Sequence, residues 1–364
     1  MKKMIFHYPS PIVDNGRSAS AIRPVKMQQA FRMAGYEVFS VTGYGKERQQ
    51  KINQLKKDIR AGVKFDFVYS ESLTMPTLLS EKNHLPSYPF LDFSFFKYCQ
   101  QSDIKVGVFY RDIYWRFSEL YETKSIIHTL VAKTFYYYDL FKYRSLDRVF
   151  LPSNEMKKYV PVVDNCKFME LPPGTVKIKN TLNHCKSDQR LNILYVGGLS
   201  DGYPMLELFK AVSQCDFVYL TLCTRKEDWD KFPNKDLLSN NIKIVHKSGD
   251  ELEELYSKAD ICSLIFEPQE WRSFAFPYKF FEYISFGKPI VAIGSTPPSR
   301  VINEEGIGWS LDYTSDAILK LFETIRDDRS LLNNALKNVE SIAEKYTWEK
   351  RALQVASALS NIPD

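Results

Sequence analysis

The sequence predicts an α/β protein built from two Rossmann-like domains, each with a parallel sheet covered by helices. Short apolar segments with strand character alternate with longer segments of helical periodicity, which is typical of βαβ units. A polar stretch without apolar periodicity, residues 175–190, separates two such runs and predicts an interdomain linker. The chain has 364 residues, of which 44% are apolar, so it is long and apolar enough to form two buried cores.

In the first run, the strand candidates are apolar segments of four to six residues. They are Met4–His7, Glu37–Val41, Phe65–Tyr69, Lys105–Tyr110 and Arg148–Leu151. The helix candidates between them have apolar residues at helical spacing, and the first ends at Gly35, which suits a helix C-terminus. They are Arg23–Ala34, Lys51–Ala61, Tyr88–Gln101 and Ile126–Arg144, with a further helix that opens at residues 152–154.

The second run repeats the same alternation after the polar stretch. Its strand candidates are Asn192–Val196, Phe217–Cys223, Ile242–His246, Ile261–Phe266 and Ile290–Ile293. Its helix candidates are Leu206–Val212, Asp250–Lys258, Tyr278–Phe286, Thr314–Asp327, Ser330–Lys345 and Trp348–Leu359.

Charge is distributed unevenly between the two runs. Residues 1–180 contain 28 basic and 17 acidic residues, a net charge of +11, whereas the remainder contains 21 and 27, a net charge of −6. A basic half joined to an acidic half indicates that one domain faces an anionic partner or surface. No signal-peptide pattern and no apolar run near the about 20 residues of a membrane span are visible. The six cysteines form no Cys-x-x-Cys pair, so we expect a cytoplasmic protein with reduced thiols.

The segment from Phe266 to Ile293 contains the most informative combination of residues. Its helix, Tyr278–Phe286, places Lys279 and Glu282 three residues apart on one face. Helix N-termini attract phosphate. A carboxylate one turn further in can accept hydrogen bonds from a sugar diol, so this pair suits a nucleotide-sugar diphosphate, with Tyr278 beside it. The alternative is a surface ion pair that contributes a few tenths of a kcal/mol.

Polar groups also follow three other strands, and parallel sheets bind ligands at such strand ends. The loop after the first strand contains Gly16, which allows close approach of the backbone, and Arg17; these and Arg23 can face a phosphate. A plain surface loop is the alternative. Gly197-Gly198 ends the first strand of the second run, where backbone N–H groups can approach a diphosphate.

The third of these strands ends at Arg111-Asp112. Arg111 stays protonated, so it can bond a sugar hydroxyl or phosphate but not act as a base, which leaves Asp112 as the polar acceptor. The alternative is a structural pair that caps a turn. Among other candidates, Arg272 in an aromatic loop can meet a diphosphate or pair with Glu267 or Glu270.

His246, at a strand end, can help to hold a nucleotide base or be a core histidine. The five histidines are scattered without a His-x-x-x-His pair, so we expect no metal and no cofactor beyond a nucleotide co-substrate. The stretch from Lys124 to Arg148 mixes cations with six aromatic residues, which suits an anionic membrane surface. The same composition also suits a nucleic-acid-binding surface, but no DNA- or RNA-binding motif accompanies it. A helix with one core face and one solvated face is a further alternative.

The motif residues in the second run resemble the donor-binding segment of family 4 glycosyltransferases, which have the GT-B fold, and in particular the capsule and exopolysaccharide branch. They are Pro277, Lys279, Glu282, Tyr283, Gly287, Lys288, Pro289 and Ala292. Residues 195–199, 255–260 and 346–351 also resemble segments of this family. The resemblance spans the whole chain, through motifs in the second half and through layout in the first.

The resemblance implies an N-terminal acceptor-binding domain at residues 1–178, joined by a returning helix at 347–364, and a donor-binding domain at 190–346. The two domains of this fold face a central cleft. Glu282 would bind the nucleotide ribose and Lys279 the diphosphate, and the loop that holds Gly16 and Arg17 would lie by the phosphates and the acceptor.

This chain departs from the family at three places. Phe274 stands where a first glutamate is common, Arg111 where a histidine is common, and Leu199 and Gly202 near two cations.

The function that follows from the resemblance is transfer of a sugar from a nucleotide diphosphate donor to a lipid-linked or polysaccharide acceptor. As in most relatives, a retaining, metal-independent reaction is expected. Two alternatives stay open. A nucleotide-sugar 2-epimerase shares the fold and the donor glutamate but needs a histidine near the sugar, where this chain has Arg111. A non-catalytic, glycosyltransferase-like scaffold subunit is favoured by the missing glutamate and cations.

Overall fold

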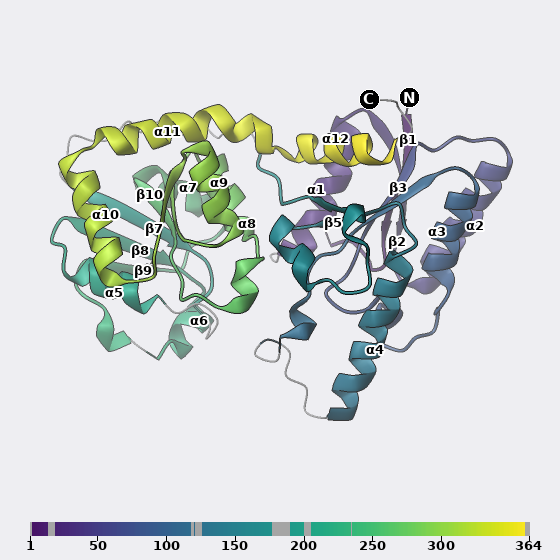
Figure 1. Ribbon diagram of the computed structural model, residues 1–364, viewed down its shortest axis with the longest axis horizontal. Coiled ribbons are helices and arrows are strands. Elements are labelled where there is room, and N and C mark those ends of the chain that lie inside the picture. Colours follow the sequence, from purple (N-terminus) through teal and green to yellow (C-terminus); the bar gives the residue numbers. More distant parts are fainter. Residues whose placement is uncertain are drawn as a thin grey trace. The chain divides into compact units, whose positions relative to one another are not determined.

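The structure, a computed structural model shown in Figure 1, describes residues 2–13, 19–117, 120, 126–176, 190–199, 205–233 and 235–360. The chain divides into two compact units. The first contains Met1–Gly174 together with Trp348–Asp364, and the second contains Thr175–Thr347. The expected linker falls largely on residues 177–189, which lie outside the described residues.

The first unit is built around a six-stranded sheet in the order β2-β1-β3-β4-β5-β6, with all pairs parallel. Its strands are β1 (Lys2–Tyr8), β2 (Tyr36–Thr42), β3 (Phe67–Glu71), β4 (Lys105–Phe109), β5 (Arg148–Leu151) and β6 (Phe168–Glu170). Its helices are α1 (Ala19–Met33), α2 (Gly45–Arg60), α3 (Leu91–Gln101), α4 (Ile126–Tyr143) and α12 (Trp348–Leu359).

The inner strands of this sheet are buried on both faces because helices cover them. All five residues of β3 and the last five of β1 are buried, which explains their nearly continuous apolar sequences. The last helix, α12, packs against α1, β3 and β4, so the end of the chain lies in the first unit, as Figure 1 shows.

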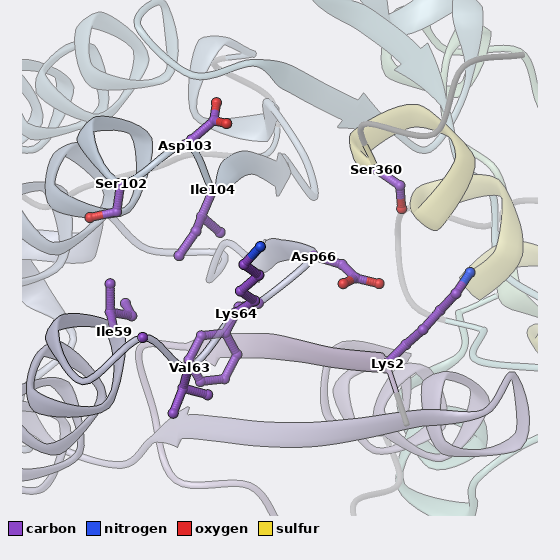
Figure 2. A pocket seen from close by; sticks show the side chains of 11 residues that line it. Lys2, Ile59, Val63, Lys64, Asp66, Ser102, Asp103, Ile104 and Ser360 are labelled. Atoms are coloured by element: carbon purple, nitrogen blue, oxygen red, sulfur yellow. The ribbon is translucent and has the colours of Figure 1, made fainter.

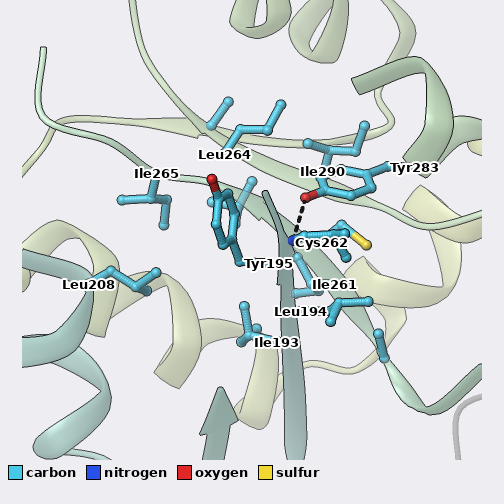
Figure 3. Close-up of a cluster of buried hydrophobic side chains, with 14 of the residues drawn as sticks. Ile193, Leu194, Tyr195, Leu208, Ile261, Cys262, Leu264, Ile265, Tyr283 and Ile290 are labelled. Carbon is cyan, nitrogen blue, oxygen red and sulfur yellow. Dashed lines mark hydrogen bonds between the residues drawn. The ribbon is translucent and has the colours of Figure 1, made fainter. Parts of the chain in front are cut away.

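The second unit repeats this plan with the strand order β12-β11-β10-β7-β8-β9, again all parallel. Its strands are β7 (Leu191–Val196), β8 (Val218–Cys223), β9 (Ile242–Val245), β10 (Ile261–Leu264), β11 (Ile290–Ile293) and β12 (Gly308–Leu311). Its helices are α5 (Leu206–Ser213), α6 (Lys226–Lys231), α7 (Leu252–Lys258), α8 (Tyr278–Ser285), α9 (Pro297–Glu305), α10 (Ser315–Asp327) and α11 (Ser330–Ile342). Apolar side chains of β7 and β10 meet those of α8 in its core, as Figure 3 shows.

Among the strands and α-helices that the structure describes, four were not expected from the sequence: β6, α6, α9 and β12. The strands are three and four residues long, and each combines apolar residues with glycine or polar residues over too short a length to stand out. Helix α9 begins with Pro297-Pro298, which resembles a chain break in sequence. Proline suits the first helical turn because its missing N–H has no partner there, and the Thr296 side chain accepts from Ser299 N and caps this helix. The helix expected at residues 152–154 is the 3-10 helix Asn154–Tyr159.

Candidate functional site

The second unit has its topological switch point between β7 and β10. The chain runs from β7 outward to β8 and β9, and then crosses to the other side of β7 to form β10, β11 and β12. Doubly wound sheets bind ligands outside the carboxyl ends of the strands at such a point. Gly197-Gly198 directly follows β7 and His246 follows β9, while Arg272 lies in the loop after β10 and α8 follows that loop. The expected donor-binding residues of this unit therefore gather at one edge of its sheet.

Helix α8 holds the expected cation and carboxylate together at this edge. Lys279 Nζ lies 2.7 Å from Glu282 Oε2, and both side chains are partly exposed. The hydroxyl of Tyr256, a buried residue of α7, donates to Glu282 Oε1 over 2.9 Å. Burial raises the pKa of Tyr256 well above its usual value, and the nearby Glu282 raises it further, so the phenol stays a donor. Tyr256, which the sequence analysis missed, thus orients the carboxylate.

Lys279 also lies near the end of β8. Burial raises the pKa of the Cys223 thiol there, and the positive charge of Lys279 partly opposes that increase. The first turn of α8 therefore lies within electrostatic reach of the carboxyl end of β8. Tyr278 is the first residue of α8, after the N-cap residue Pro277, so it accompanies the pair.

The Gly197-Gly198 turn is closely packed on its inner side. A Cβ atom on Gly197 would lie 2.3 Å from the Tyr195 hydroxyl, and one on Gly198 would lie 3.1 Å from Asp228 Oδ2. Asp228 lies on α6 and pairs with Arg225, 3.7 Å away. The sequence analysis missed these two residues, although charged residues directly after a strand were an available signal. A side-chain carboxylate near Gly198 disfavours an anion at that position unless Arg225 or Lys279 offsets it.

His246 is exposed rather than part of the core, which removes the alternative considered for it. Its Nδ1 lies 2.8 Å from the Thr224 carbonyl oxygen. A carbonyl only accepts, so Nδ1 carries the proton, and in the neutral ring Nε2 is left as an acceptor. The ring is thereby held at the ends of β8 and β9, where it can contact a planar base.

The loop between β10 and α8 holds Arg272 against aromatic rings. The guanidinium lies 4.8 Å from the ring centroid of Phe266 and 4.4 Å from that of Trp271, and the residue is buried. Phe274, which stands in place of the family's first glutamate, is 2% exposed and belongs to the interior, while Glu267 and Glu270 are exposed. The loop therefore orients a cation through aromatic packing.

In the first unit, Arg111 and Asp112 follow β4 as expected, and Glu71 joins them from the end of β3. Arg111 Nη2 lies 3.4 Å from Glu71 Oε2, and its Nε donates to the Ser72 carbonyl oxygen. Asp112 is instead bonded by the Tyr114 backbone N–H and the Thr74 side chain, and burial raises its pKa to about 7. The expected turn-capping pair is thus only part of the arrangement, because Glu71 holds Arg111.

Arg23 is the one expected phosphate-loop residue that the structure describes, and it lies in the interior of the first unit. Arg23 is 3% exposed, with Nε 3.3 Å from Glu71 Oε1, Nη2 donating to the Leu171 carbonyl oxygen and its guanidinium 3.5 Å from the centroid of the Phe109 ring. Arg23 is therefore an internal cation and does not face a phosphate as expected. Gly16 and Arg17 lie outside the described residues.

A second buried polar network lies behind the ends of β1 and β3. His7 bonds Ser70 Oγ through Nδ1 and Asp92 Oδ1 through Nε2, and Arg48 forms two bonds to Asp92. Burial lowers the pKa of His7, and the salt-bridged Asp92 has a lowered pKa despite its burial. All four side chains are at most 3% exposed, so this serine–histidine–aspartate arrangement braces the unit and has no access for a substrate.

A cavity of about 640 Å³ in the first unit lies away from these strand ends. It is lined by residues at the starts of β1, β3 and β4, including Lys2, Asp66 and Ile104, together with Ser360 at the end of α12, as Figure 2 shows. It therefore lies at the amino edge of the sheet, opposite to Arg111 and Asp112. Within the described ranges, no cluster of three potential metal ligands occurs, and no helix is long and apolar enough to cross a membrane.

Comparison with known proteins gives structural neighbours but no sequence relatives. No protein-family model matches the chain, and no curated protein matches it. Anabaena Alr3699/HepE, solved in complex with UDP and glucose, is 14% identical over 100% of both chains, with a TM-score of 0.63. Sucrose-phosphate synthase from Thermosynechococcus elongatus is 14% identical over 98% of both chains, with a TM-score of 0.63. WaaG, a glycosyltransferase involved in lipopolysaccharide biosynthesis, is 12% identical over 100% of both chains, with a TM-score of 0.56.

These likenesses run the full length of the chain and agree with its two six-stranded parallel sheets. The chain therefore has the GT-B fold that the sequence predicted. At 12 to 14% identity the comparison establishes the fold alone.

Proposed function

We propose that the protein is a glycosyltransferase of family 4 type that moves a hexosyl group from a nucleotide diphosphate sugar to a lipid-linked or polysaccharide acceptor. The observation that carries this proposal is the Lys279–Glu282 pair on α8, beside the switch point of the second sheet and oriented by Tyr256. Complexes of the structural neighbour HepE with UDP and with UDP-glucose support a nucleotide-sugar donor.

The donor would bind in the second unit, which contains the expected donor-binding domain at residues 190–346. Each carboxylate oxygen of Glu282 accepts one hydrogen bond within the protein and has a lone pair left, so two more donors, such as a ribose diol, can be bound. Lys279 and Arg272 supply cations for the diphosphate, Gly198 lets the backbone approach it, and His246 lies where a base can stack. These roles follow from the chemistry that each side chain offers at one sheet edge.

The reaction would retain anomeric configuration and need no metal. The bond between the sugar C1 and the diphosphate oxygen breaks, the acceptor oxygen bonds to C1 from the same face, and the acceptor proton passes to the departing phosphate. The protein has to stabilise the charge on the leaving diphosphate, which is the part that preorganised cations and N–H groups perform.

The acceptor would bind in the first unit, which corresponds to the acceptor-binding domain expected at residues 1–178 with the returning helix at 347–364. Arg111, oriented by Glu71, would bond a sugar hydroxyl or phosphate, and Asp112 would accept from the reacting sugar or the acceptor. The proposed biological setting is polysaccharide biosynthesis, such as that of a capsule.

Helix α4 supports a peripheral association with an anionic membrane surface at the cytoplasmic face. Leu130 and Phe141 are 61% and 56% exposed, and at 3.6 residues per turn they lie within about 20° of each other on the helix surface. Lys133 flanks this apolar stripe on one side and Lys142 on the other, and Arg144 directly follows the helix, which is the pattern of an interfacial helix. Lys124 lies outside the described residues.

The alternatives make different predictions about the bound nucleotide. A scaffold subunit would bind no nucleotide sugar, or bind it without turnover, and a 2-epimerase would change the sugar of the donor without any acceptor. Thermal unfolding with UDP, GDP, ADP and their common sugar derivatives identifies the nucleotide that binds, because a ligand at 100 times its Kd stabilises the fold by about 2.7 kcal/mol. Analysis of the sugar after incubation of that donor with and without an acceptor then distinguishes transfer, epimerisation and binding without turnover. The transferase proposal is refuted if no nucleotide of this panel raises Tm, or if the bound sugar nucleotide is epimerised.

A further inference from the structure

The strands β7 and β10 separate at the point where a ligand is expected. They pair at Ile193 with Ile261 and at Leu194 with Cys262, and not beyond. On the outer side of β7, its pairing with β8 continues to Val196 with Cys223. On the outer side of β10, its pairing with β11 continues to Leu264 with Ala292. A gap therefore opens between the two central strands just before the Gly197-Gly198 turn.

The hydroxyl of Tyr283 fills this gap from α8. It accepts a hydrogen bond from Val196 N over 3.1 Å, and its oxygen lies 3.5 Å from the Ser263 carbonyl oxygen, so it bridges β7 and β10. Figure 3 shows Tyr283 directed at the strand backbone, with this bond dashed. The residue is fully buried, and burial raises its pKa well above the usual value, so the bridging hydroxyl keeps its proton.

A second tyrosine holds the other end of the turn. The hydroxyl of Tyr195 donates to the Gly198 carbonyl oxygen over 2.7 Å and occupies the space that a side chain on Gly197 would need. The edge of the Phe266 ring packs against Tyr195, with the centroids 5.6 Å apart. On the remaining side, Gly197 N donates to the Cys223 carbonyl oxygen. Hydrogen bonds thus hold both peptide groups that flank the two glycines in place.

These bonds determine where the next backbone donor points. In a trans peptide the C=O and the following N–H are directed oppositely. Tyr195 turns the Gly198 carbonyl toward its own ring, so the Leu199 N–H is directed away from that ring. Leu199 stands near a place where relatives carry a cation, so a fixed backbone N–H is the donor that this chain offers there. Two adjacent glycines would otherwise be highly mobile, and ordering them would weaken binding.

We propose that Tyr195 and Tyr283 are positioning residues that preorganise the Gly197-Gly198 turn for the diphosphate of the donor. This inference rests on the proposed function, and it names the means by which the site binds phosphate without the usual cations. Neither hydroxyl touches the donor, and both act through the backbone of the turn.

The experiment compares Tyr195→Phe and Tyr283→Phe with Tyr219→Phe, an exposed tyrosine of β8. Calorimetry measures Kd for UDP and for uridine, and amide hydrogen exchange without ligand follows the segment that contains the turn. We expect Tyr195→Phe to raise the Kd for UDP about 5- to 10-fold, to leave that for uridine within about 2-fold and to speed exchange in the turn, since one hydrogen bond is removed. Tyr219→Phe should match the wild type in all three measurements.

The outcomes separate this inference from the proposed function. If the wild type binds UDP and Tyr195→Phe binds it equally well with unchanged exchange, the positioning role is wrong while the transferase proposal stands. Equal losses for UDP and uridine would assign Tyr195 to general stability. If neither the wild type nor any variant binds UDP, GDP or ADP, both proposals are overturned. Should Tyr283→Phe fail to fold, Tyr195→Phe alone decides the question.

Discussion

Replacing Glu282 by alanine tests the proposed donor site most directly. The structure predicts two separate losses, because the carboxylate accepts from the buried Tyr256 hydroxyl and from Lys279. A buried donor left without its acceptor costs about 1 to 3 kcal/mol of stability, whereas the partly exposed Lys279 pair contributes about 1 kcal/mol or less. The fold should therefore survive with a lowered Tm.

The loss in ligand affinity should be separate from this loss in stability and of similar size. Hydrogen bonds to a charged group contribute about 1.5 to 3 kcal/mol, and each 1.4 kcal/mol is tenfold in Kd. Loss of the ribose contact should therefore raise the Kd for both UDP and uridine about 10- to 100-fold. Lys279→Ala should weaken the binding of UDP more than that of uridine, because the partner of Lys279 would be a phosphate.

Calorimetry with UDP, UMP and uridine checks these expectations. Glu282→Gln is the informative companion variant, because the amide oxygen can still accept from Tyr256 while the charge is lost. Glu254→Ala is the matched control, since Glu254 is an exposed carboxylate of the same unit that pairs with Lys247 and Lys258. The reasoning is refuted if Glu282→Ala is folded and binds uridine and UDP within about 2-fold of the wild type. Glu282 would then only orient Tyr256.

Three further predictions concern the first unit. Asp112→Asn should lower kcat about 10- to 100-fold with little change in donor Kd. Because burial raises the pKa of Asp112 to about 7, turnover by the wild type should decrease as the pH falls below 7, and the variant should lose this dependence. If the variant turns over as fast as the wild type, Asp112 has only a structural role. Burial also raises the pKa of Asp139 to about 7, so its contribution to stability should fall as pH rises from about 4 to about 7. In urea unfolding, the free energy of unfolding of Asp139→Asn should therefore rise relative to that of the wild type by about 2 to 3 kcal/mol between pH 5 and pH 8. A difference between the two proteins that stays constant with pH would contradict this. The wild type should sediment with vesicles of anionic lipid at low salt but not at 1 M salt. A variant with Lys133, Lys142 and Arg144 all changed to Glu should stay in the supernatant under both conditions. A wild type that stays in the supernatant at low salt would refute the membrane proposal.

The fold class and the position of most elements could be predicted from the amino-acid pattern alone. Apolar segments such as Ile290–Ile293 and Arg148–Leu151 appear in the structure with the predicted bounds, because a strand buried on both faces has a continuous apolar pattern. The Lys279–Glu282 pair was also predictable, since residues three apart on a helix share a face. Strand β12 and the proline-led α9 were not, because β12 lacks a continuous apolar sequence and Pro297-Pro298 resembles a chain break.

Which polar groups act together could not be predicted, because it depends on contacts between distant parts of the chain. Tyr256 lies 26 residues before Glu282 and Glu71 lies 40 residues before Arg111, so no local spacing reveals these contacts. The interior position of Arg23 and the exposure of His246 also depend on which elements pack over them, which composition does not specify. The bridge from Tyr283 to Val196 exists because two strands diverge at a switch point, and that divergence is a property of the assembled sheet.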